Sequence, residues 1–246
     1  MKNLSISVLI ATLFFANLFV SLADTKQDIE NANKNGKIVF LVVTERGNPN
    51  TKEAMNLAEK AQKSISKSTV LELDRTSIAN HKLVQTYRLA GAPTPLILVI
   101  ATNGFVAGGA PTQNLTPEQL VNMVPSPKEE DVLKAIYEGN SVFVIFSKQF
   151  DSNSKKQLDA CQSACKSLKD KATIINLDID DKNEKTFINK FKFDKNASFP
   201  ITYVINAQGQ ISSMFNGITE AKSLVEAANK KVSSGCCPPS SGKVCK

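Results

Sequence analysis

The chain carries short runs of consecutive apolar residues, separated by stretches in which apolar residues recur every three or four positions. Uninterrupted apolar runs predict strands buried on both faces, and the recurring positions predict helices with one buried face. The apolar runs lie at 37–44, 70–74, 96–100, 141–147, 174–178 and 202–205. Helical periodicity covers 50–65 and 155–168. This order predicts an α/β fold in which a mixed central sheet is flanked by helices.

The same series of elements occurs twice. Val70 and Ile174 lie 104 residues apart in matching runs, and Lys37 and Ser141 begin another pair with the same separation. A separation kept across several elements predicts an internal duplication, with each repeat reading strand, helix, strand, helix, strand, strand, helix. The two prolines in 125–127 stop a helix and stiffen the link between the repeats. We therefore expect one domain at 24–125 and a second at 126–232.

Residues 1–23 have the pattern of a secretory signal peptide. Lys2 precedes an apolar run that ends near Val20, and the small residues Ser21 and Ala23 stand before Asp24. An uncleaved anchor is the alternative, but the run is near the lower limit for spanning a bilayer, and the small residues favour cleavage after Ala23. We expect an exported protein without a membrane span after cleavage. It would work in the periplasm, outside the cell or in the lumen of the secretory pathway.

The composition of the chain excludes several classes of protein and function. Among 246 residues, 42% are hydrophobic and 22% are charged, which is typical of a globular protein and excludes wholesale disorder. The net charge of +7 is spread along the chain, so we expect no nucleic-acid partner. His81 is the single histidine, so any catalytic triad or metal centre that needs histidine would have to use it.

Two proline segments carry a family resemblance. Residues 87–94, Tyr-Arg-Leu-Ala-Gly-Ala-Pro-Thr, precede an apolar strand and an Asn-Gly turn, and resemble the cis-proline segment of thioredoxins. Residues 198–202 resemble it more loosely. The resemblance implies two tandem thioredoxin-like domains, with cis bonds at Ala92–Pro93 and Phe199–Pro200. In that family, the residue before the cis-proline offers its backbone N–H and C=O to an extended peptide. The resemblance therefore implies a binding ledge for a polypeptide partner or client at each proline.

The redox motif of that family is missing. Thioredoxins carry Cys-x-x-Cys where the first strand leads into the next helix, and the helix N-terminus there lowers the thiol pKa. The corresponding positions are Gly47 and Asn50 in the first repeat, and Asp151 and Ser154 in the second. We therefore expect redox-silent domains without catalytic residues or a cofactor. They resemble the non-catalytic modules of protein disulfide isomerases.

The five cysteines lie elsewhere. Cys161 and Cys165 are one helical turn apart, where they would either fill the core or form half of a metal or redox site. The core interpretation is favoured, because buried free cysteine is common and this spacing suits a disulfide poorly.

The C-terminal segment 233–246 is rich in Ser, Gly and Pro, and we expect it to be a flexible tail. It contains Cys236, Cys237 and Cys245. An intramolecular or intermolecular disulfide ranks first for these thiols, binding of a soft metal ion such as Cu(I) or Zn²⁺ second, and a catalytic thiol third.

Two functions follow from these patterns. The first is a redox-silent protein-binding or scaffold module, supported by two retained folds with two altered redox sites. The alternative is a thiol-disulfide oxidoreductase or soft-metal-binding protein that uses the tail cysteines.

Overall fold

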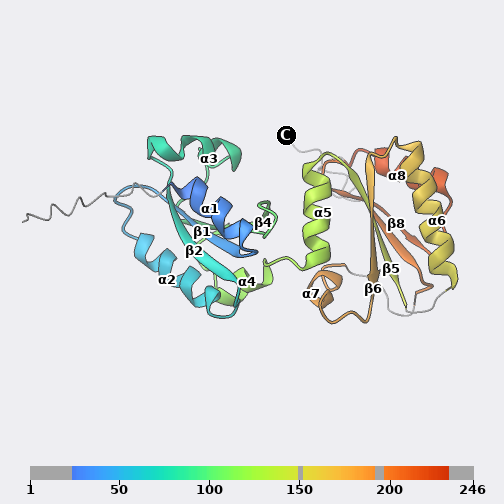
Figure 1. Ribbon diagram of the computed structural model, residues 1–246, viewed down its shortest axis with the longest axis horizontal. Helices are drawn as coiled ribbons and strands as arrows, with labels where there is room; N and C mark the ends of the chain where they lie inside the picture. The colour runs from blue at the N-terminus through green and yellow to red at the C-terminus, as the bar shows by residue number, and fades with distance from the viewer. Residues whose placement is uncertain (1–23, 149–151, 192–196, 233–246) are drawn as a thin grey trace, which may run out of the picture.

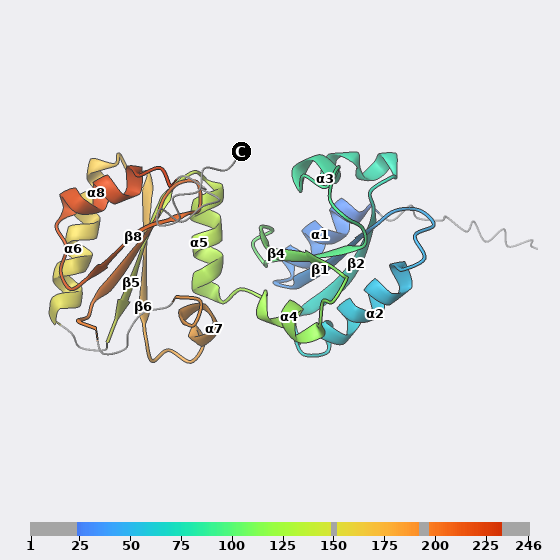
Figure 2. The same ribbon diagram turned by 180° about the vertical axis from the view of Figure 1, so that it is seen from behind.

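The computed structural model describes residues 24–148, 152–191 and 197–232. The proposed signal peptide, Asp151 and the three tail cysteines lie outside these ranges. The described chain forms two four-stranded sheets, each with helices on both faces (Figure 1). Figure 2 shows the same two units from behind. The two-domain α/β organisation predicted from the sequence is therefore confirmed.

The first domain begins with a helix that the sequence patterns did not predict. Its elements are α1 (Thr25–Lys34), β1 (Ile38–Thr44), α2 (Thr51–Gln62), β2 (Ser68–Asp74), η1 (Ile78–Asn80), α3 (His81–Thr86), β3 (Leu96–Ile100), β4 (Val106–Pro111) and α4 (Pro117–Asn122). In α1, the buried positions are Thr25, Ile29 and Ala32. This stripe contains a single large apolar residue, which is too weak a signal to reveal an amphipathic helix.

The second domain repeats this order. Its elements are α5 (Pro127–Tyr137), β5 (Ser141–Ser147), α6 (Ser152–Ser167), β6 (Ala172–Asp178), α7 (Lys185–Ile188), β7 (Ile201–Ile205), β8 (Ile211–Asn216) and α8 (Ala221–Asn229). Helix α5 directly follows the proline-rich link: Ser126 is its N-cap and Pro127 its first residue. Proline suits that position because its missing N–H would have no helical partner there.

Both sheets have one topology. The strand orders are β2-β1-β3-β4 and β6-β5-β7-β8. In each sheet the first two strands are parallel and the other pairings are antiparallel. The register shifts at Val99/Ile100 in one sheet and at Val204/Ile205 in the other, so even the irregularity is duplicated.

The central strands hold each domain together. Every residue of β1 and of β5 is buried. Alternate residues of β1 enter two separate core clusters, one beneath α1 and α3 and the other beneath α2 and α4. Strand β5 divides its side chains in the same way between α5 with α7 and α6 with α8. Removing either layer of helices would expose one complete face of a sheet.

The separation between the repeats is not constant. β1 and β5 begin at Ile38 and Ser141, 103 residues apart, while β2 and β6 begin at Ser68 and Ala172, 104 residues apart. The separation of 104 predicted for the first strands is therefore wrong by one residue. Because both faces of this strand are buried, its side chains do not alternate between apolar and polar, and the sequence cannot reveal a slip of one residue.

The two domains touch through the turn between β3 and β4. The Glu130 carboxylate of α5 accepts hydrogen bonds from the backbone N–H of Thr102, at 3.1 Å, and from its hydroxyl, at 2.5 Å. The side-chain amide of Asn103 donates to the Glu130 carbonyl oxygen, and the rings of Phe105 and Tyr137 lie 4.3 Å apart between centroids. These contacts fasten the turn of the first domain to the first helix of the second.

Within the described ranges, no helix is both long enough and apolar enough to cross a bilayer.

The buried central strand predicts a difference between two truncations in the first domain. Leu41 is fully buried in β1, whereas Ile78 is 94% exposed. We expect Leu41→Ala to reduce the free energy of unfolding by about 2–5 kcal/mol, because it leaves a cavity between packed layers. Ile78→Ala should change it by less than about 0.5 kcal/mol. Urea denaturation followed by circular dichroism measures both, and equal losses would contradict this description of the core.

Candidate functional site

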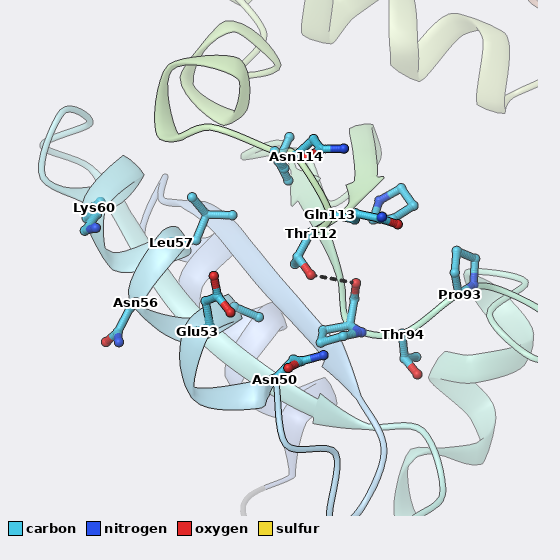
Figure 3. A pocket seen from close by; sticks show the side chains of 14 residues that line it. Asn50, Glu53, Asn56, Leu57, Lys60, Pro93, Thr94, Thr112, Gln113 and Asn114 are labelled. Atoms are coloured by element: carbon cyan, nitrogen blue, oxygen red, sulfur yellow. Dashed lines mark hydrogen bonds between the residues drawn. The ribbon is translucent and has the colours of Figure 1, made fainter.

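A polar groove runs along the first domain between α2 and the loop from β4 to α4. Its volume is about 690 Å³. Helix α2 contributes exposed side chains such as Glu53, and the opposite wall comes from loop residues 112–115. Pro93 and Thr94 lie at one end (Figure 3), and Pro95 also lines the groove. A second hollow of about 520 Å³ shares Pro111 and residues 113–115 with the groove and continues it towards α4. Together the two hollows reach from Pro93 to Gln119 of α4.

The proline segment differs from the prediction by two residues. The cis bonds are Thr94–Pro95 and Phe199–Pro200, so the prediction for Phe199–Pro200 is confirmed and that for Ala92–Pro93 is wrong. Pro95 and Pro200 are the matching residues, because a strand begins immediately after each. The Pro95 carbonyl oxygen accepts from the backbone N–H of Thr112, and the Pro200 carbonyl oxygen accepts from that of Gly217.

Thr94 therefore takes the place that the sequence assigned to Ala92. Among the described residues, neither the backbone N–H nor the C=O of Thr94 has a hydrogen-bond partner. By contrast, the Ala92 carbonyl oxygen accepts a hydrogen bond from the guanidinium of Arg75. The segment thus presents one unpaired peptide donor and one unpaired acceptor at the end of the groove.

Arg75 fixes the segment that leads into this end. Its guanidinium pairs with the Glu45 carboxylate and also donates to the carbonyl oxygen of Leu89 at 2.9 Å. A planar guanidinium can hold several acceptors in a fixed geometry, which suits it to this position. In the second domain, Ile179 follows β6 where Arg75 follows β2, and Lys148 follows β5 where Glu45 follows β1. This ion pair therefore belongs to the first domain alone.

Of the two positions in the first domain that correspond to the redox cysteines, only Asn50 lines the groove. Asn50 stands at the N-cap of α2, makes no side-chain capping bond, and lines the groove beside Thr94 (Figure 3). Gly47 lies in the preceding turn with φ of +79°, a conformation that suits glycine, and does not line the groove. The structure therefore brings Asn50 together with Pro93 and leaves Gly47 and Ala92 outside.

The second domain presents a different surface at the matching place. Phe199 is half-buried, packs against the core cluster beneath α5 and α7, and has the Lys148 ammonium 4.8 Å from its ring centroid. Ser154 lies in the first turn of α6, and its hydroxyl oxygen is buried with no hydrogen-bond partner within the described ranges. Neither feature resembles the open segment at Thr94.

The two described thiols are core residues. Cys161 is fully buried and Cys165 is half-buried against the same cluster, and both are free. Burial raises the pKa of Cys161 to about 12 and also raises the pKa of Cys165. A thiol with a raised pKa is a poor nucleophile near neutral pH. The sequence prediction of core thiols agrees with this placement.

No cluster of three or more His, Cys, Asp or Glu side chains suited to a metal ion occurs in the described part of the chain. The predicted disulfide or metal site at Cys236, Cys237 and Cys245 lies outside it.

Several groove residues escaped the sequence patterns. Glu53, Leu57 and Thr112 read as ordinary helix and loop positions, and nothing in their spacing marked them. Pro95 carried a usable signal, because it directly precedes an apolar run as Pro200 does.

Both domains have the features that the thioredoxin resemblance implies: a mixed four-stranded sheet flanked by helices, with a cis-proline directly before β3 and before β7. Among solved structures, the chain is similar to the first two thioredoxin domains of Saccharomyces cerevisiae Eps1p, with 11% identity and a TM-score of 0.31, over 84% of this chain and 96% of that one. It is also similar to the zinc-bound form of human ERp44, with 11% identity and a TM-score of 0.35, over 82% of this chain and 57% of that one. The NTD_N/C domain of alkylhydroperoxide reductase AhpF from Enterococcus faecalis matches with 15% identity and a TM-score of 0.27, over 82% and 98% of the two chains.

Likenesses this distant concern the fold alone. Comparison with models of protein families gives no match, and comparison with curated proteins gives none either.

The burial of Cys161 predicts slow chemical modification. Its pKa of about 12 leaves a very small thiolate fraction at pH 8, and its sulfur is covered by the core. We expect iodoacetamide to label Cys161 in the native protein at least about a hundredfold more slowly than in urea. Peptide mass spectrometry after timed quenching measures the two rates. Equal rates would show that α6 does not bury this thiol.

Proposed function

We propose that the protein is an exported, redox-silent member of the thioredoxin-like class that binds an extended polypeptide segment in the groove of its first domain. The observation that carries the proposal is that both the backbone N–H and the backbone C=O of Thr94, at the end of the groove, have no hydrogen-bond partner among the described residues. An extended peptide can donate to such a carbonyl and accept from such an N–H, as in strand addition to a sheet edge.

The chemistry of the lining supports binding rather than catalysis. The groove contains several carboxamides and hydroxyls, one acidic residue and one basic residue, and no cysteine or histidine. Neither position assigned to a redox pair in the first domain carries a thiol, and the pKa of each described thiol is raised. Groups of this kind hold a ligand through hydrogen bonds and supply no nucleophile near neutral pH.

The geometry also supports a preformed site. Arg75 holds two carbonyl oxygens of the segment that leads to Pro93, and Pro95 accepts from both the backbone and the hydroxyl of Thr112. These bonds fix the proline end of the groove and join it to the loop wall, independently of any ligand. Binding to a fixed surface costs less conformational entropy than binding to one that must first become ordered.

A pair of glutamate substitutions on α2 tests the proposal. Glu53 and Glu59 are both exposed, but only Glu53 lines the groove. We expect wild-type protein to retain members of an immobilised library of random-sequence peptides. Glu53→Trp should weaken binding of those peptides about tenfold or more by filling the groove, whereas Glu59→Trp should leave it unchanged. Fluorescence anisotropy with the selected peptides measures the affinities.

Two results would contradict the proposal. One is that the wild-type protein selects no peptides from the library. The other is that the two tryptophan variants bind the selected peptides equally well. Thermal unfolding of both variants checks that the comparison is made between folded proteins.

A further inference from the structure

The second sheet ends in a strand that carries apolar side chains on the protein surface. Strand β8 stands last in the order β6-β5-β7-β8, so within the described chain only one of its edges is paired with another strand. Ile211 and Met214 of β8 are 53% and 46% exposed, and Ile218, two residues beyond the strand, is 50% exposed. Three of the six large apolar side chains that are exposed in the described chain therefore lie within eight residues.

The outer edge of β8 also offers backbone donors and acceptors. The Gly217 N–H, directly after the strand, donates to the Pro200 carbonyl oxygen before β7. In an antiparallel pair, residues bonded to the partner strand alternate with residues whose N–H and C=O point away from it. Counting back from Gly217, the peptide groups of Asn216 and Met214 point away from β7. An added strand could bond to them.

The other three outer edges of the two sheets are protected in ways that β8 is not. β2 carries the exposed Glu72, whose carbonyl oxygen accepts from the Thr25 hydroxyl at 3.3 Å. β4 ends in Pro111 and contacts α5 of the second domain (Figure 1). β6 has no large apolar side chain that is exposed. Charges, prolines and covering elements are the usual means of blocking a sheet edge, and residues 206–219 contain no charged residue and no proline.

We propose that β8 is an interface at which a second copy of this chain adds its own β8 in the antiparallel direction. A two-fold axis at Met214 places the Met214 residues of the two copies opposite each other, and the N–H of each donates to the C=O of the other. Two four-stranded sheets then join into one sheet of eight strands. This inference does not depend on peptide binding in the groove of the first domain.

The composition of the edge favours a second copy over a different partner. A strand that pairs with itself brings any charge near the axis close to its own copy, and like charges directly opposite are destabilising. Residues 206–219 are uncharged, so they pair with themselves without repulsion, whereas a charged peptide finds no complementary charge there. Pairing also removes the exposed Met214 side chains from water. Because both copies use the same edge, the contact closes as a dimer.

Sedimentation velocity over a dilution series tests the interface. The chain is studied after removal of the predicted signal peptide, with a reducing agent that prevents the tail thiols from linking two copies. One pair of strands buries less area than the usual stable interface, so we expect monomer near about 1 µM and dimer to accumulate between about 10 and 500 µM.

Two matched substitutions show whether β8 carries the association. Met214→Glu should weaken it about tenfold or more, because two carboxylates then lie opposite each other on the axis. Val106→Glu should leave it unchanged. Val106 is also an exposed apolar residue, and it begins β4 as Ile211 begins β8.

A mixture of two charge variants locates the axis. We expect Met214→Lys alone to associate as poorly as Met214→Glu alone. An equimolar mixture of the two should associate at least as strongly as wild type, because opposite charges then meet across the axis. Recovery in the mixture also excludes a folding defect as the reason for the loss in each variant.

Four results would overturn the inference. The first is a wild-type chain that stays monomeric over the whole series with reducing agent present. The second is association that Met214→Glu does not weaken. The third is an equal loss in Val106→Glu, which would show that β8 is not the surface concerned. The fourth is a mixture of the two Met214 variants that associates no better than either alone.

Discussion

The structure depends on a single strand in each domain that is buried on both faces. Because β1 and β5 expose no residue, each sheet needs a helical layer on either side, and the connections between strands must supply those layers. The same strand pairs with a parallel neighbour and an antiparallel one. The turn that follows β1 therefore lies beside the proline segment that precedes β3. The groove of the first domain is formed at this junction.

The two copies of this scaffold differ in the features that bear on binding. The first domain has Arg75 to hold the proline segment, an unpaired peptide group at Thr94, and a small residue at Ala54. The second has a half-buried Phe199 and a Gln157 side chain that connects helix and loop. A duplicated fold has thus kept its core, while the groove residues of the first domain and the helix-to-loop bond of Gln157 in the second make the two copies differ at their surfaces and loops.

The sequence predicts the layers of this fold better than its details. Consecutive apolar runs identified the strands, since burial on both faces demands them. The same burial concealed the true alignment of Ile38 with Ser141, because a strand without alternation has no visible register. The cis bond was predicted at Pro93 instead of Pro95, because two prolines stand close together there and only the exact start of the strand distinguishes them. The groove residues Glu53 and Thr112 were not predictable, since an exposed helix position and a loop position carry no signal of the hollow that the fold forms between them.

The central claim is that the loops before α8 and α4 differ: Gln157 pairs with the Thr219 N–H in the second domain, whereas the Gln113 and Asn114 N–H groups have no partner among the described residues of the first. Backbone amide hydrogen exchange, followed by NMR in the absence of ligand, tests it most directly. The account predicts that the Thr219 amide, which donates to Gln157, exchanges roughly tenfold or more slowly than the unpaired amides of Gln113 and Asn114. It also predicts that Gln157→Ala removes this protection while the strands of the second domain stay protected. Exchange at Thr219 as fast as at Asn114 in the wild-type protein would contradict the account.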